Sequence, residues 1–215
     1  MGAAVKTALV LGGAACLWDD IHAFWGLRGF NPAPGNLIAP EKPWQGVVAC
    51  NDSMMEWPGE LDAAVSLHCR FFETKGWRAE RARRGYPEAK RHIGHHEAFR
   101  GSLGKKAGLT PDLIASHYCF PGQPKSGSSG LFAAKVALID LGFERAVLCG
   151  IPMNGDPHFF GGDPWKSYEG FRRSWLEVPK EYRARMRSMS GWTRVLLGPP
   201  ETERIPDETL HDQPN

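Results

Sequence analysis

Continuous apolar runs, without alternating polar positions, mark the strands that the sequence predicts. Such runs are typical of strands covered on both faces, as in a parallel sheet. The clearest run is residues 7–11, and further strands are predicted at residues 47–50, 62–67, 112–116 and 146–149. A last short strand is predicted at residues 193–197, before a Gly-Pro-Pro break.

Helix-forming stretches separate most of these runs. Residues 14–25, with Asp19 and Asp20 facing outward, and residues 129–141 are predicted to be helical. Polar residues 73–84 are helix-prone, and residues 165–187 are predicted to be helical with a break at Pro179. Strands that alternate with helices indicate a three-layer α/β domain, in which helices flank a mostly parallel sheet.

A single domain is expected over residues 1–200, because 215 residues suffice for one substantial core. Within it, residues 70–110 are predicted to be an irregular insertion and residues 163–192 a helical, tryptophan-rich segment. Residues 201–215 are polar and are expected to form a loosely held tail.

The charge balance disfavours bulk nucleic-acid binding, because 26 Lys and Arg oppose 24 Asp and Glu. Basic residues gather in two regions, which are either solvated helix faces or local surfaces for an anionic ligand. They are Arg78, Arg81, Arg83, Arg84, Lys90, Arg91 and Arg172, Arg173, Arg183, Arg185, Arg187.

A cytoplasmic location without a membrane partner is expected. No N-terminal segment has the order of a signal peptide, and the apolar residues 8–17 are too few to span a bilayer. The five cysteines form no CxxC pair and are predicted to be mostly buried free thiols in a reducing compartment. The sequence does not indicate an oligomeric state.

The strongest candidate for ligand binding is a glycine–serine run that leads directly into the helix at 129–141. Its residues are Ser126, Gly127, Ser128, Ser129 and Gly130. A helix N-terminus has unpaired N–H groups that attract anions, glycines allow close approach, and serine hydroxyls add donors. The run therefore predicts a phosphate or carboxylate site; the alternative is a flexible loop with a serine cap.

Further candidates follow the ends of predicted strands. Ligands of parallel sheets bind beyond the carboxyl ends of the strands, so these residues should meet at one edge. They are Gly12-Gly13, Asn51-Asp52, His68 and Gly150. Gly12 and Gly13 form either a plain tight turn or a turn that borders a nucleotide. Asn51 and Asp52 either bind a ribose or base or cap a helix.

Two histidine groups could carry chemistry. His158 follows the strand at 146–149 and is a candidate general base, because an unperturbed histidine titrates near neutral pH, although a lone histidine is more often structural. His92, His95 and His96, with Glu97 nearby, are predicted to be a solvated basic cluster, and no metal site is assigned.

Several aromatic side chains in the C-terminal segment are predicted to cover the sheet, and one or two of them could instead stack on a base or a sugar ring. They are Trp165, Tyr168, Phe171, Trp175 and Trp192. The sequence lacks a full G-x-G-x-x-G, a P-loop and a G-x-S-x-G elbow, which disfavours classical dinucleotide sites, P-loop ATPases and serine hydrolases.

Four short pieces between residues 7 and 160 carry a resemblance to a known superfamily. They are the glycine turn after residues 9–11, the strand that ends in Asn51-Asp52, the run 126–130 with its helix, and residues 147–153 followed by His158. Together they resemble the Rossmann-like superfamily of motility-accessory-factor proteins, 6-hydroxymethylpterin pyrophosphokinase-like proteins and the bacterial sialyltransferases that use CMP-activated sialic acid.

The resemblance implies a Rossmann-like fold and a nucleotide-sugar-dependent, glycosyltransferase-like enzyme with a nucleotide or nucleotide-sugar as co-substrate. The first two pieces would border the nucleoside, the run 126–130 would hold the phosphate or an acidic sugar, and His158 would assist proton transfer. Mg²⁺ dependence stays open. One departure is Pro152, where those proteins often have an aspartate. The alternatives are a pyrophosphokinase-like phosphotransferase and a non-catalytic nucleotide-binding accessory protein.

Overall fold

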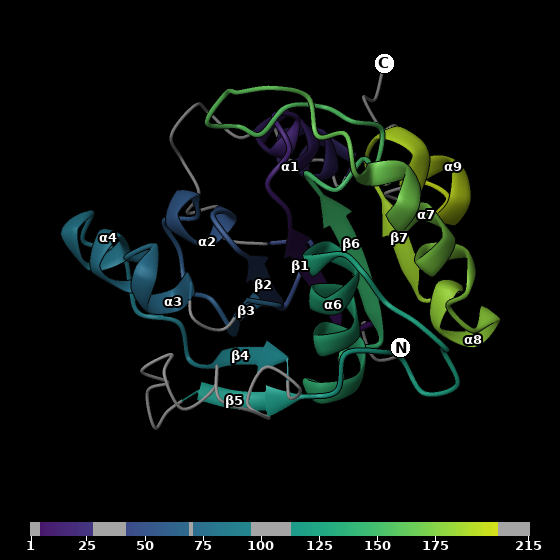
Figure 1. Cartoon of the computed structure of the whole chain (residues 1–215), viewed down its shortest axis with the longest axis horizontal. Coiled ribbons are helices and arrows are strands. Elements are labelled where there is room, and N and C mark those ends of the chain that lie inside the picture. The colour runs from purple at the N-terminus through teal and green to yellow at the C-terminus, as the bar shows by residue number, and fades with distance from the viewer. Residues whose placement is uncertain (1–4, 28–41, 69–70, 96–112, 202–215) are drawn as a thin grey trace, which may run out of the picture.

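The computed structural model describes residues 5–27, 42–68, 71–95 and 113–201. In these residues seven strands form one sheet in the order β5-β4-β3-β2-β1-β6-β7, and all of the paired strands are parallel (Figure 1). The strands are β1 (Thr7–Leu11), β2 (Gly46–Cys50), β3 (Ala63–Ser66), β4 (His92–His95), β5 (Leu113–Ser116), β6 (Arg145–Cys149) and β7 (Met186–Ser188).

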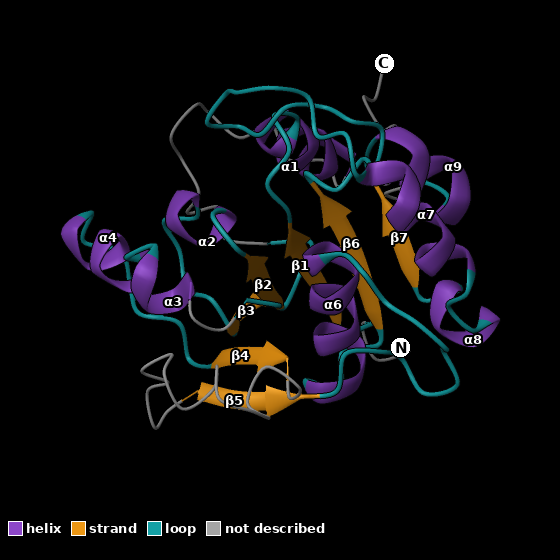
Figure 2. Ribbon diagram, viewed as in Figure 1, coloured by secondary structure: helices purple, strands orange, loops and turns teal. Residues whose placement is uncertain are grey.

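Helices cover both faces of the sheet (Figure 2). They are α1 (Leu17–Leu27), α2 (Ser53–Glu56), α3 (Phe71–Thr74), α4 (Trp77–Arg83), α6 (Ser129–Lys135), the π-helical continuation η2 (Val136–Asp140), α7 (Tyr168–Leu176), α8 (Lys180–Arg183) and α9 (Gly191–Leu197). The predicted three-layer α/β fold with a parallel sheet is therefore confirmed.

The central strand β1 shows why the apolar runs do not alternate. Ala8 and Val10 belong to the core beneath α6, η2 and α7, whereas Leu9 and Leu11 belong to the core beneath α1, α2 and α4. All five residues of β1 are buried. Successive side chains point to opposite faces, so a strand between two helix layers is apolar on both faces, as residues 8–11 are. Thr7, at the start of the strand, is buried and donates its hydroxyl to the Val5 carbonyl.

Strand β4 contradicts the prediction of irregular structure in this part of the chain. It pairs in parallel with β3, with His92 opposite Ala64 and Ile93 opposite Val65. His92 and His95 are only 4% and 8% exposed, so the prediction of a solvated cluster is wrong for both. His96 and Glu97 lie outside the described residues. The strand was missed because only one of its four residues is strongly apolar.

The C-terminal part also differs from the prediction. Pro179 separates α7 from α8, as expected, but residues 186–188 form strand β7 instead of helix. Residues 193–197, predicted as a strand, belong to α9. Val195 is 86% exposed while Thr193 and Leu197 are buried, which is the one-sided burial of a surface helix. A short apolar run does not distinguish the two structures.

The described part of the chain contains no helix with the length and apolar character needed to cross a bilayer. The thiols of Cys50 and Cys149 are fully enclosed by the two cores, whereas Cys16 and Cys119 are partly exposed. Burial raises the pKa of Cys50 to about 12. These two buried thiols are therefore protonated at physiological pH and serve as small apolar side chains.

Candidate functional site

A cavity of about 650 Å³ lies at the carboxyl edge of the central strands. It is bounded by the loops that follow β1, β2, β3 and β6, by the start of α6 and by one residue of α7. Ten of the residues predicted at this edge line it: Gly12, Gly13, Asn51, His68, Gly127, Ser128, Ser129, Gly130, Gly150 and His158. The loop between β6 and α7 arches over this end of the sheet (Figure 1).

Two predicted site residues lie outside the lining of this cavity. The Oδ1 atom of Asp52 accepts a hydrogen bond from the indole Nε1 of Trp77 at 2.7 Å, and its Oδ2 atom lies 3.8 Å from Nε2 of His158. Asp52 therefore lies next to His158 but does not line the cavity. Ser126 lines a second cavity, of about 600 Å³, together with Lys125 and Lys135.

The sequence left two interpretations of the glycine–serine run, an anion site and a loop with a serine cap, and the start of α6 has features of both. The Oγ atom of Ser128 caps the helix by accepting a hydrogen bond from the Leu131 amide at 3.2 Å. No described residue accepts a hydrogen bond from the amides of Ser129 or Gly130, and both residues line the cavity. The helix start is therefore capped by Ser128, and two further N–H donors, those of Ser129 and Gly130, stay available to an anionic ligand.

Gly12 and Gly150 bring two loops into backbone contact. Gly12 donates to the Cys149 carbonyl at 2.8 Å, and Ala14 donates to the Gly150 carbonyl at 3.1 Å. A Cβ atom on Gly12 would lie 2.3 Å from the Gly150 oxygen, and Gly150 has a φ of +69°. Only glycine fits at these two positions. The tight turn at Gly12 therefore also forms part of the cavity wall.

Asn51 adopts a left-handed backbone conformation, with a φ of +53°. Its Oδ1 atom accepts a hydrogen bond from Ser66 at 2.9 Å, which fixes the orientation of the side-chain amide. Among the described residues no acceptor is recorded for its Nδ2 group. Since Asn51 lines the cavity, this group can donate to an oxygen of a ribose or base.

His158 lies against the turn that follows β1. The chain on either side of it is held by hydrogen bonds, from Ala15 to the Pro157 carbonyl and from Phe159 to the Gly13 carbonyl, each 3.0 Å long. The imidazole lies so close to Gly13 that a Cβ atom there would be 2.3 Å from Nε2.

The surroundings of His158 favour its neutral form. Burial lowers the pKa of His158, and the nearby Asp52 carboxylate opposes this shift only in part. The Nδ1 atom has no hydrogen-bond partner among the described residues. A neutral imidazole at neutral pH can accept a proton, which is the requirement for a general base.

Residues of the loop between β6 and α7 complete the wall of the cavity. Asn154, Asp156, Asp163, Trp165 and Lys166 all line it. Trp165 is one of the aromatic side chains for which stacking on a base or a sugar ring was the alternative prediction, but none of the five was a predicted site residue, because a loop of this length carries no periodicity that would place it over the sheet. In the described part of the chain no group of three or more His, Cys, Asp or Glu side chains is arranged to hold a metal ion.

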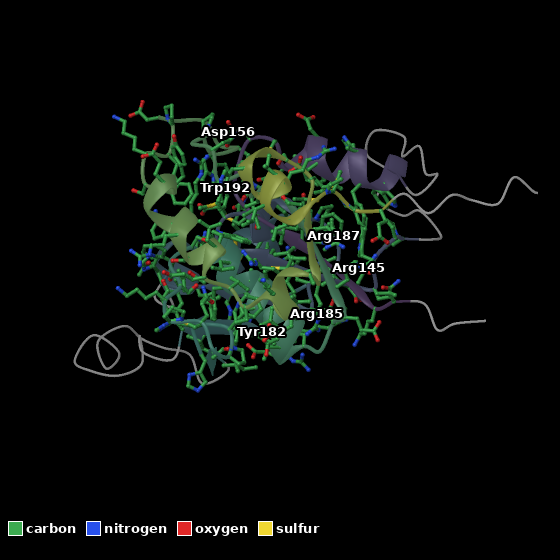
Figure 3. All side chains as sticks on the ribbon, turned by 90° about the vertical axis from the view of Figure 1, so that its right-hand side faces the viewer. Arg145, Asp156, Tyr182, Arg185, Arg187 and Trp192 are labelled. Atoms are coloured by element: carbon green, nitrogen blue, oxygen red, sulfur yellow. The ribbon has the colours of Figure 1, made fainter. Side chains whose placement is uncertain are left out.

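The arginines near β7 lie away from the cavity. Figure 3 shows Asp156 toward one end of the molecule and Arg145 and Arg185 toward the other. Arg185 is engaged by backbone carbonyls, including that of Glu144 at 3.0 Å. These side chains therefore secure the amino ends of β6 and β7 and take no part in the candidate site.

Asp20 supports the site from within the fold, contrary to the prediction that it faces outward. It is 5% exposed, and its Oδ2 atom accepts hydrogen bonds from the Gly150 amide and from Ser190 Oγ, both at 2.8 Å. Burial raises the pKa of Asp20, and the two hydrogen bonds counteract that rise only partly. The carboxylate thereby joins α1 to the Gly150 turn and to the start of α9.

Replacing Asp20 with asparagine is expected to remove one pH-dependent contribution to stability. Because the folded pKa lies above the unfolded one, this contribution is complete below the unfolded pKa and is lost as pH rises through the folded pKa. The stability of Asp20→Asn relative to the wild type should therefore increase with pH, by about 1.4 kcal/mol for each unit of pKa elevation.

Urea unfolding between about pH 4 and pH 8 measures this difference. Asp19→Asn is the matched control, because Asp19 is the exposed neighbour on the same helix. A constant difference between Asp20→Asn and the wild type over this pH range would contradict the assignment.

Comparison with known structures places the fold among bacterial sialyltransferases. The sialyltransferase CstII from Campylobacter jejuni, in complex with the substrate analogue cytidine-5'-monophosphate, matches with a TM-score of 0.59 and 14% identity, over 94% of this chain and 87% of that chain. The monofunctional α-2,3-sialyltransferase Cst-I from Campylobacter jejuni matches with a TM-score of 0.60 and 15% identity, over 94% of this chain and 82% of that chain.

A third structure, sialyltransferase CST-II in complex with a trisaccharide acceptor and CMP, has a TM-score of 0.59 and 12% identity, over 92% of this chain and 87% of that chain. At these identities the likeness shows a shared fold. It confirms the sialyltransferase part of the resemblance at the level of fold, and nothing supports the part that concerns motility-accessory-factor and pyrophosphokinase-like proteins. No protein-family model and no curated protein matches the chain.

Proposed function

We propose that this chain is a glycosyltransferase-like enzyme that binds a nucleotide-sugar in the cavity at the carboxyl edge of the sheet. The observation that carries the proposal is the convergence of unbonded donors and a neutral histidine in one cavity. The amides of Ser129 and Gly130 lie at one wall, Asn51 and the Gly12 turn at another, and His158 between loops. The shared fold with CMP-bound sialyltransferases supports the choice of a nucleotide ligand.

Each element of the cavity suits one part of such a ligand. Asn51 and the glycines of the turn after β1 would border the nucleoside, since they follow β2 and β1. The Ser129 and Gly130 amides would bind the phosphate, and Lys166 adds a positive charge to the same cavity. Catalysis would then depend on positioning and on the stabilisation of charge that develops on the phosphate.

The transfer step can be written with the chain's own groups. The acceptor hydroxyl oxygen forms a bond to the anomeric carbon, and the bond from that carbon to the phosphate oxygen breaks. The electron pair of the broken bond goes to the phosphate, whose charge the amides stabilise. His158 takes the hydroxyl proton, which its lowered pKa permits at neutral pH.

A non-catalytic nucleotide-binding protein is the second candidate, because of Pro152. It occupies the position where the resemblance leads to the expectation of a carboxylate, and it is buried, with its carbonyl accepting a hydrogen bond from the Thr193 amide. The two candidates differ in turnover. Release of free nucleotide from a nucleotide-sugar in the presence of an acceptor supports the enzyme, whereas tight binding without release supports the binding protein.

The basic test is thermal unfolding with CMP, UDP, GDP, ATP and their sugar conjugates. A ligand at 100 times its Kd stabilises a protein by about 2.7 kcal/mol, which raises the melting temperature by several degrees. We expect at least one nucleotide to do so. The proposal is wrong if none of them shifts the transition.

Replacing Ser129 with proline is expected to weaken nucleotide binding on the order of tenfold. Ser129 is the first residue of α6, where proline fits the backbone, and Ser128 before it is extended with φ −110° and ψ 144°. The substitution therefore removes one N–H donor, a hydrogen bond to an anionic group worth about 1.5 kcal/mol or more, and preserves the helix start.

Ser129→Ala is the matched control, since it removes the hydroxyl and keeps the amide. The nucleotide-induced shift in melting temperature should persist in Ser129→Ala and diminish in Ser129→Pro. Equal shifts in the two variants would show that the amide does not bind the ligand.

A further inference from the structure

Trp165 is a large aromatic side chain that lines the cavity and yet stays exposed. Its exposed fraction is 40%, although the rest of the fold buries most tryptophans almost completely. No described residue accepts a hydrogen bond from its indole N–H. An exposed aromatic surface inside a concave site is a common feature of sites that bind a flat or partly apolar ligand.

The indole packs against α7 and, through Phe171, against the segment that leads into α6. Its ring stacks on Phe171 of α7, with centroids 5.5 Å apart and planes 21° from parallel. Phe171 in turn lies on Gly127, where a Cβ atom would be 2.3 Å from Cδ1 of the phenyl ring. The stack of Gly127, Phe171 and Trp165 is therefore a rigid support for the exposed indole.

The stack lies on the phosphate side of the cavity. Gly127 directly precedes the helix start that carries the Ser129 and Gly130 amides, and a Cβ atom on Gly130 would lie 2.9 Å from Ile151, just after β6. Asn51, at the end of β2, lies beyond β1 in the sheet order. α7 lies on the β6–β7 side of the molecule, and α2 lies on the other side (Figure 1). Trp165 is thus nearer to the expected site of transfer than to the nucleoside.

Polar groups surround the indole in a manner that suits a sugar. Asn154, Asp163 and Lys166 line the same cavity from the same loop and offer an amide, a carboxylate and an ammonium group. A pyranose ring presents an apolar C–H face, which packs on an aromatic ring, and a rim of hydroxyls, which form hydrogen bonds with such side chains.

We infer that Trp165 is the platform of an acceptor subsite, on which a pyranose ring of a glycoside acceptor stacks. This inference rests on the proposed transferase function, because it assigns the acceptor side of the same cavity. Asp163 and Asn154 would accept and donate hydrogen bonds at the sugar hydroxyls. Trp165 is a specificity-determining residue for the acceptor, and it has no part in proton transfer.

Saturation-transfer NMR with methyl β-D-galactopyranoside and methyl β-D-glucopyranoside, in the presence of saturating CMP, tests this assignment directly. The wild type should transfer saturation to the ring C–H protons of at least one of the two. Trp165→Ala should weaken the binding of that glycoside about fivefold to tenfold, and Trp165→Phe should retain most of it. Leu176→Ala, at a 52% exposed residue of α7 outside the cavity, should have no effect.

The melting shift that CMP induces is measured on the same variants and separates the two proposals. If CMP shifts the wild type and Trp165→Ala equally while only Trp165→Ala loses the glycoside, the subsite is supported. Glycoside binding that is unchanged in Trp165→Ala, or no glycoside binding to the wild type, overturns it. A Trp165→Ala variant that loses the CMP shift also overturns it, because the indole would then stack on the base. A wild type that no nucleotide stabilises refutes the transferase function itself.

Discussion

Replacing His158 with alanine is expected to lower kcat about a hundredfold or more and to leave nucleotide affinity nearly unchanged. A positioned general base contributes a factor of about 10² to 10⁴ to the rate. One backbone hydrogen bond on each side of His158 holds it against the turn that follows β1, and its Nδ1 has no partner among the described residues. Release of free nucleotide from the nucleotide-sugar that stabilises the protein is the measurement.

The pH dependence of the reaction should reflect the titration of His158. Because burial lowers the pKa of His158, kcat/KM should rise with pH and level off below the usual histidine value of about 6.5. His22→Ala serves as control, since His22 is exposed on α1 and outside the cavity. An unchanged kcat in His158→Ala, or a loss confined to nucleotide affinity, would remove His158 from the catalytic groups.

The fold was predictable because its central strands are buried on both faces. Residues 8–11 are apolar at every position, and this lack of alternation indicated a parallel sheet between helices. The same reasoning failed at β4, whose histidines are polar but are buried by aromatic side chains from other segments, such as Phe72 and Phe132. It also failed at α9, where five apolar or β-branched residues fit either a strand or one face of a helix.

The candidate site was predictable as far as strand ends define it. Parallel strands bring the residues after their carboxyl ends together, so Gly12, Asn51, Gly150 and the start of α6 could be assigned to one edge without coordinates. Tertiary contacts decide the rest. Asp20 lies on the same helix as the exposed Asp19, but it is buried and accepts hydrogen bonds from Gly150 and Ser190, which are distant in the sequence. The position of Trp165 depends on how a long loop folds back on α7.

Arg81 is the most strongly engaged buried cation in the part of the chain that the structure describes. It lies on α4, is 3% exposed, and donates to the carbonyls of Met54, Trp57, Gly59 and Pro87. Burial lowers the pKa of its guanidinium, yet arginine stays charged in proteins. The contacts with Met54, Trp57 and Gly59 hold α4 to α2 and to the segment after it, which follow Asn51 and Asp52.

Replacing Arg81 with methionine should therefore destabilise the protein by about 3 to 5 kcal/mol. Methionine retains much of the side-chain stem, but it leaves four carbonyl groups without their donor, and an unsatisfied buried acceptor costs about 1 to 3 kcal/mol. Urea unfolding measures the change as a shift of the midpoint at constant slope. The expected result is a loss large enough to lower the population of folded protein at 37 °C.

Arg83→Met is the matched control on the same helix. The Arg83 side chain is 72% exposed and pairs with Glu80 at 2.7 Å, an exposed ion pair whose loss should change stability by no more than about 0.5 kcal/mol. Both variants remove one guanidinium charge. The difference in stability between Arg81→Met and Arg83→Met therefore reports the effect of burial and of the hydrogen bonds to carbonyls. If the two substitutions proved equally mild, the carbonyls around Arg81 would have to find donors in water, and the segment after α2 would be held by its apolar contacts alone.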